Sequence, residues 1–193
     1  ILVLEYSDGS FDTLDGCYPI DNFNSPAFNN GSTPDERGLR FQLPFPARLE
    51  GAIVRVDLDA AANLVLYDSG SSALATITLD ENFRFNTGGH NLRALFATPQ
   101  DLLKNTTYRL VLKPTTGTSV TFYDWIVTNA NYLNNFQGGA NWQHTERTDA
   151  GAWTDTTTKR PWMSLLLSAF DDAAQASGPP SPIRYTPGYC IAG

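Results

Sequence analysis

The segment RALFATPQDLLKNTTYRLVLKPTTGTSVTFYDWIVTN, residues 93–129, contains two runs of strand-forming sequence joined by one compact turn. In residues 108–113 (YRLVLK), Tyr and Leu alternate with Arg, Val and Lys, which is the period-2 pattern of a strand with one buried face. Residues 114–119 (PTTGTS) supply the proline and glycine that turns favour, and residues 120–127 (VTFYDWIV) return to β-branched and aromatic residues. This pattern predicts a β-hairpin.

Short strand-forming segments continue on both sides of this stretch. A second hairpin is predicted where residues 63–68 and 73–79 flank the turn SGSS. In residues 48–58, the alternation directs Val54, Val56 and Leu58 to the core. No segment has the helical period, and further strands are predicted at residues 39–43, 142–147 and 162–170. We therefore expect an all-β fold, a two-sheet antiparallel β-sandwich that is jelly-roll-like and carries extended N- and C-terminal arms.

The pattern divides the chain into three regions. Residues 1–38 begin with one predicted strand and continue in turn-forming Asn, Asp, Gly and Ser, so we expect an irregular acidic arm there. Residues 39–170 hold the alternating segments and form the predicted sandwich domain. Residues 171–193 centre on the sequence GPPSP, which cannot build a core and predicts an extended Pro/Gly-rich arm.

Charge and hydropathy exclude two classes of partner. The formal net charge is −7, and no cluster of Lys and Arg supplies the cationic face that phosphate binding requires, so we expect no nucleic-acid partner. Seven acidic and two basic residues fall in residues 1–40, which concentrates the negative charge at the N-terminal end. No apolar run reaches the ~18 residues of a membrane span, so we expect no membrane partner.

Two cysteines lie near opposite ends of the chain, Cys17 and Cys190. A disulfide between them would close a loop over most of the chain and contribute a few kcal/mol, about 2–5, by restricting the unfolded state. Two free thiols in a reducing compartment are the alternative. Because both residues lie in Pro/Gly-rich segments, bridges between neighbouring subunits are a third reading.

The titratable residues form no recognisable catalytic or metal-binding motif. The two histidines, His90 and His144, have no partner at a metal-ligand spacing. Asp57 with Asp59, Asp124 and Glu146 are candidates for the paired acids of a glycoside hydrolase, but their pairing depends on distances that the sequence does not give. Asp57 and Asp59 share one strand face, which suits a solvated edge equally well. We therefore expect no enzymatic activity, no cofactor and no metal site.

Aromatic residues among Asn, Gly and Thr are the best candidates for binding a ligand. Tyr132, Trp142 and Trp153 lie in such a context, and exposed rings of this kind stack on sugars while amides and hydroxyls bind the sugar hydroxyl groups. A carbohydrate-binding module is therefore one functional hypothesis, with glycans as possible partners. The competing interpretation is that these rings close the open end of the sandwich.

The body of the chain resembles the β-sandwich structural proteins of tailed bacteriophage virions. The resemblance covers residues 35–172 and consists of pattern, carried by residues 35–41 (DERGLRF), 63–79, 96–109, 141–156 and 160–172. It implies a structural protein of the virion, acting as a capsid decoration, fibre or tail-associated module and often multimeric. We therefore expect other virion proteins and copies of this chain as partners, and the two arms, residues 1–38 and 171–193, as the segments that bind them. The resemblance assigns no functional residue.

Overall fold

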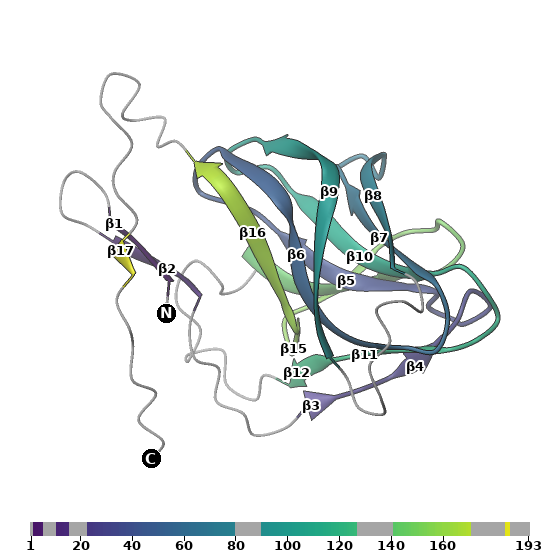
Figure 1. Cartoon of the computed structure of the whole chain (residues 1–193). Helices are drawn as coiled ribbons and strands as arrows, with labels where there is room; N and C mark the ends of the chain where they lie inside the picture. The colour runs from purple at the N-terminus through teal and green to yellow at the C-terminus, as the bar shows by residue number, and fades with distance from the viewer. Residues whose placement is uncertain are drawn as a thin grey trace, which may run out of the picture.

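The computed structural model describes residues 2–5, 11–15, 23–79, 90–126, 141–170 and 184–185. All regular elements in these residues are strands, and most of them form two large antiparallel sheets that face each other in Figure 1. The main cluster of buried apolar side chains draws on both sheets. The chain is therefore an all-β sandwich, as the alternating pattern predicted. The jelly-roll connectivity stays a prediction.

The first sheet has six strands in the order β14-β13-β5-β10-β7-β8. Its members are β14 (Thr154–Thr156), β13 (Trp142–Arg147), β5 (Glu36–Phe41), β10 (Tyr108–Pro114), β7 (Ala62–Tyr67) and β8 (Ala73–Leu79). Each adjacent pair is antiparallel. β5 and β10 lie in the middle, so their two neighbours use the backbone groups on both of their edges.

The second sheet is organised around the long strand β6 (Ala47–Leu58). β16 (Met163–Phe170), β11 (Val120–Phe122), β4 (Ala27–Phe28) and β9 (His90–Leu102) complete this sheet. A small sheet consists of β15 (Lys159–Pro161), β12 (Asp124–Ile126) and β3 (Phe23–Asn24). Along the chain, β12 directly follows β11, and β15 directly precedes β16. In β6, Val54, Val56 and Leu58 are buried, which confirms the face predicted from the alternation.

The predicted hairpin of residues 108–127 is wrong. β10 pairs with β5 and β7 in the first sheet, whereas β11 pairs with β6 and β4 in the second. The turn between them therefore crosses from one sheet to the other, as β-sandwich connections do. Alternation determines which face of a strand is apolar, but it does not determine the neighbouring strand. Arg109 and Val111, expected on an open face, are also buried.

The second predicted hairpin is confirmed. β7 and β8 pair antiparallel through the turn that begins at Asp68. The backbone N–H of Ser71 donates to the carbonyl of Asp68 at 3.1 Å, and Ser72 N–H donates to the Asp68 carboxylate at 2.8 Å. Ser71 adopts a φ of 70°, so this turn is stabilised by the aspartate in the way that Asp favours turns.

The two ends of the chain contribute to one further sheet. β1 (Leu2–Glu5) lies between β2 (Phe11–Asp15) and β17 (Arg184–Tyr185), with both pairings antiparallel. The predicted boundary between residues 38 and 39 falls inside β5, and β3 and β4 also pair with strands of the body. The sandwich thus includes residues that the sequence pattern assigned to the N-terminal arm. Cys17 and Cys190 lie outside the described residues.

Candidate functional site

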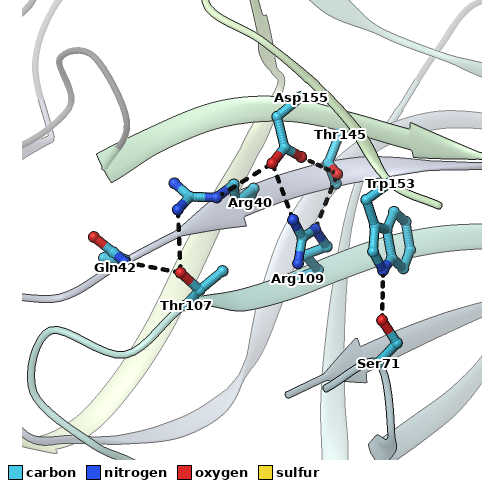
Figure 2. A network of polar contacts seen from close by, with 8 residues as sticks. All are labelled: Arg40, Gln42, Ser71, Thr107, Arg109, Thr145, Trp153 and Asp155. Carbon is cyan, nitrogen blue, oxygen red and sulfur yellow. Dashed lines mark hydrogen bonds and ion pairs between the residues drawn. The ribbon is translucent and has the colours of Figure 1, made fainter. Parts of the chain in front are cut away.

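A polar network covers the outer face of the six-stranded sheet (Figure 2). In β5, β10 and β13, Phe41, Leu110 and Trp142 belong to the core, and the opposite parity carries Arg40, Arg109 and Thr145. The strand register sets Arg109 opposite Arg40 and Thr145 opposite Asp155. These four residues, with Gln42 and Thr107, are called the outer-face network below.

Asp155 is the centre of the outer-face network. Its Oδ2 accepts a hydrogen bond from Nη2 of Arg109 at 2.9 Å and lies 3.4 Å from Nε of Arg40. Its Oδ1 accepts the hydroxyl of Thr145 at 2.6 Å, and the same hydroxyl oxygen accepts Nε of Arg109 at 3.2 Å. The Asp155 side chain is only 24% exposed, so these charge-assisted bonds lie in a partly desolvated setting that strengthens them.

The network extends toward the turn before β10. Oγ1 of Thr107 accepts hydrogen bonds from Nη2 of Arg40 at 3.1 Å and from Nε2 of Gln42 at 2.8 Å. Burial lowers the pKa of Arg40, the charge of Asp155 opposes this effect, and the charge of Arg109 adds to it. The guanidinium remains the charged form at neutral pH because the ordinary arginine pKa lies so high. The network therefore offers hydrogen-bond donors rather than a titrating acid or base.

Trp153 packs over the network as a cover (Figure 2). Its ring centroid lies 4.1 Å from Cζ of Arg147 and 5.1 Å from Cζ of Arg109, and it meets Tyr67 edge-on at 5.6 Å between centroids. Its Nε1 donates to Oγ of Ser71 at 2.8 Å. Two cation–π contacts, one hydrogen bond and one ring contact thus hold the β13–β14 connection against the sheet.

A buried carboxylate continues the ionic contacts beyond Trp153. Glu36 has no exposed surface, and its two oxygens accept Nζ of Lys113 at 2.9 Å and Nη2 of Arg147 at 3.0 Å. Because Arg147 also contacts the ring of Trp153, the ion pairs of Glu36 are connected to Trp153. Without both cations, Glu36 would be an uncompensated buried charge, which is strongly destabilising.

Asp124 and His144 form a second buried polar pair. Nε2 of His144 lies 3.5 Å from Oδ2 of Asp124, and neither side chain is exposed. Neither carboxylate oxygen nor either ring nitrogen has a hydrogen-bond partner within the described residues. Burial raises the pKa of Asp124 to about 7, with the charges of Lys159 and Arg37 opposing it. Burial, followed by the same two charges, lowers the pKa of His144 to about 3.

The described residues bring together no arrangement typical of catalysis. The Thr145 hydroxyl contacts the Asp155 carboxylate but is fully buried, and Asp124 is likewise enclosed rather than open to a substrate. No three His, Cys, Asp or Glu side chains gather as metal ligands in the part of the chain that the structure describes. Within the same residues, no helix is long and apolar enough to cross a membrane.

Of the residues predicted to bind a glycan, the structure describes Trp142 and Trp153 and places them in different settings. Trp142 is 5% exposed and belongs to the core, with its ring 6.0 Å from that of Phe41, so the prediction of an exposed platform is wrong for this residue. Trp142 is the first residue of β13 and faces inward opposite Phe41. Trp153 is half-buried under its arginine contacts. Tyr132 lies outside the described residues.

Sequence reasoning missed the outer-face network. Its residues come from segments as far apart as Arg40 and Asp155, and each is an ordinary polar residue on the outward parity of its strand. A usable signal was the occurrence of arginines at outward positions of predicted central strands, since a charged residue there requires a partner when the face is covered. Comparisons with protein-family models, curated proteins and solved structures found no match to this chain.

Proposed function

We propose that this chain is a non-enzymatic structural protein of a bacteriophage particle, either a capsid decoration, a fibre or a tail-associated module. In this role it resides on the virion and binds other virion subunits through residues 1–38 and 171–193. The pattern of residues 35–172 supports the proposal through its resemblance to virion β-sandwich proteins. The all-β fold is compatible with it, since sandwiches of this kind form many capsid domains.

The observation that carries the proposal is the pairing of the two chain ends. β1 forms its ladders with β2 and β17, and no strand of the sandwich joins this sheet within the described residues. A small sheet with free edges suits binding to a neighbouring subunit, because an edge presents unpaired N–H and C=O groups that another chain's strand can bind. The acidic charge of residues 1–40 adds electrostatic selectivity for a basic partner surface.

The organisation of the body agrees with a supporting role. The polar side chains that cross the outer face, Arg40, Arg109 and Asp155, bind one another. The buried carboxylate of Glu36 is likewise bound by two cations of the same chain. These contacts make the sandwich more rigid, and they pair these charged groups within the chain. A rigid body of this kind suits a subunit that holds its neighbours in fixed positions.

The test compares particle occupancy of full-length variants. Val3→Pro removes a backbone N–H from the central strand of the terminal sheet, which a ladder does not tolerate. Ser69→Pro is the control, because this exposed residue occupies the second position of the β7–β8 turn, where proline is favoured. Each variant is added to particles that lack the protein, and bound copies are quantified by gel densitometry.

The proposal predicts that Ser69→Pro binds like the wild type, whereas Val3→Pro loses at least tenfold in occupancy. Circular dichroism spectra that match for the two variants show that the sandwich is retained in both. Full occupancy by a correctly folded Val3→Pro chain would refute binding through the terminal strands. Failure of all three proteins to bind would refute the virion role itself.

A further inference from the structure

Asn30 and Gly31 form the only Asn-Gly pair in the sequence, and they lie in the connection between β4 and β5. Asparagine is thermally labile, and a following glycine has no side chain to hinder attack by its own backbone nitrogen. In that reaction the nitrogen of Gly31 bonds to Cγ of Asn30, and the amide nitrogen leaves with the Gly31 proton as ammonia. Water then opens the resulting succinimide ring to aspartate or isoaspartate. The pair is therefore a candidate for modification without an enzyme.

Both residues of the pair are accessible. Asn30 and Gly31 are exposed. Apart from the chain neighbours of Gly31, a Cβ built on it would have only Oδ1 of Asn29 within 4 Å among the described residues, at 3.5 Å. Asn105 is also exposed, but the next residue is Thr106, whose branched side chain crowds the attacking nitrogen. Solvent and steric access therefore favour Asn30 over Asn105 as a site of deamidation.

Two hydrogen bonds restrain the reacting groups in the folded chain. The backbone N–H of Gly31 donates to Oδ1 of Asn29 at 2.9 Å, which is an Asx turn. Nδ2 of Asn30 donates to the carbonyl oxygen of Thr115 at 3.3 Å. The Gly31 nitrogen must lose its proton and turn toward Cγ of Asn30 before it can attack. It can do neither while it donates to Asn29, so this hydrogen bond opposes the reaction.

We propose that Asn30 is a site of spontaneous deamidation and that the side chain of Asn29 sets its rate. Asn29 is itself held in place, because its Nδ2 donates to the carbonyl oxygen of Gly117 at 2.9 Å. Its Oδ1 also accepts the hydroxyl of Ser32 at 3.2 Å. An acceptor fixed in this way keeps the N–H of Gly31 occupied, and its removal frees the nitrogen to attack. The inference does not depend on the virion role.

Deamidation acts on the contact between this connection and the turn that crosses from β10 to β11. The backbone N–H of Asn30 donates to the carbonyl of Thr116 at 3.1 Å, and its side chain donates to the carbonyl of Thr115. A carboxylate has no N–H to donate, so it places a charged oxygen beside the Thr115 carbonyl oxygen. Isoaspartate also lengthens the main chain at this residue. Both products therefore weaken the contact with the turn between the two sheets.

The first test measures the rate of deamidation at Asn30 in full-length wild type, Asn29→Ala and Asn29→Asp. Each protein is incubated in mildly alkaline buffer, and the digested chain is analysed by mass spectrometry with fragmentation that separates Asn29 from Asn30. Asn29→Asp is the matched control, because its carboxylate keeps an acceptor for Gly31 and loses the donor to Gly117. We expect Asn29→Ala to react at least threefold faster than the wild type and Asn29→Asp to stay within twofold of it. Equal rates in all three, equal acceleration in both variants, or no product at Asn30 overturns the proposal.

The second test measures the consequence of the modification. Asn30→Asp reproduces the aspartate product, and Asn105→Asp adds the same charge at an exposed turn residue whose φ of 53° aspartate adopts readily. Thermal unfolding of both full-length variants is followed by circular dichroism. Because Asn30→Asp loses the hydrogen bond to Thr115, its midpoint should fall by about 2–4 °C, and that of Asn105→Asp by less than about 1 °C. Equal shifts in the two variants contradict the proposed effect on the contact with Thr115.

Discussion

Oδ2 of Asp124 lies 3.5 Å from Nε2 of His144 in a position where neither side chain contacts solvent. Burial raises the pKa of the carboxyl to about 7 and lowers that of the imidazole to about 3. Between these values the folded pair holds one proton, on the carboxyl group, and carries no charge. The unfolded chain also holds one proton in most of this range, but it holds that proton on the histidine.

Because the proton counts match, the pair has little effect on how the free energy of unfolding of the wild type depends on pH. From roughly pH 4 to pH 6.5, folded and unfolded states each bind one proton at these two residues, so the pair adds little slope to the free energy of unfolding. Charges of Lys159 and Arg37 act on both groups, Glu146 acts on Asp124, and Asp155 acts on His144. Single substitutions should expose two opposite slopes.

Asp124→Asn leaves His144 as the titrating group. Its pKa of about 3 in the folded state lies below the unfolded value of ~6.5, so the unfolded chain binds more protons between these values. The free energy of unfolding should then increase with pH across this window, by up to ~1.4 kcal/mol per pH unit. Urea unfolding at a series of pH values measures the slope, and a profile parallel to that of the wild type would contradict the account.

His144→Gln leaves Asp124 as the titrating group and should reverse the sign. The folded carboxyl has a pKa of about 7 and the unfolded one ~3.9, so the folded state binds more protons between them. The free energy of unfolding should be largest below pH ~4 and decrease as the pH rises to ~7. The same urea series tests it. A stability that rises with pH in this variant is the incompatible result.

Substitutions of Trp142 and Trp153 should lower the free energy of unfolding by different amounts. Trp142→Ala empties a core position and should lower the free energy of unfolding by about 3–5 kcal/mol. Trp153→Phe keeps a ring over Arg147 and loses the hydrogen bond to Ser71, which should cost about 1 kcal/mol. Chemical denaturation of both variants decides the point. Near-equal losses would show that the two rings are not placed as core and cover.

Gly38 is required by the close approach of β5 and β10. A Cβ added there would lie 2.1 Å from the carbonyl oxygen of Leu110 and 2.5 Å from Cα of Val111, both backbone atoms. Gly38→Ala should therefore lower the free energy of unfolding by about 3 kcal/mol or more. At Gly117 an added Cβ meets nothing within 4 Å, so Gly117→Ala is the matched control and should change it by less than ~1 kcal/mol. Equal effects at the two glycines would disprove the steric explanation.

The sequence allowed prediction of strand faces and of turns with local chemistry. Val54 and Val56 were directed to the core by alternation alone, and the Asp68 turn follows from the residues that form it. The pairing of β10 and β11 was not predictable in the same way, because the choice between sheets depends on strands distant in sequence. Local pattern contains no information about such partners.

The site shows the same limit. Trp142 and Trp153 occur in similar polar contexts, and only the register of β13 against β5 separates the buried ring from the covering one. Arg40 and Asp155 meet because β5, β13 and β14 are neighbours, which no spacing along the chain indicates.

The most direct test of the proposed virion role is to measure whether the full-length chain sediments with phage particles from infected cells. A lysate of infected cells is separated on a density gradient, and the chain is detected by mass spectrometry in the particle and soluble fractions. The account predicts that the chain sediments with intact particles in a fixed ratio to the major capsid protein and stays with them through a second gradient. Recovery of the chain only in the soluble fraction would contradict the proposed role as a structural protein of the particle.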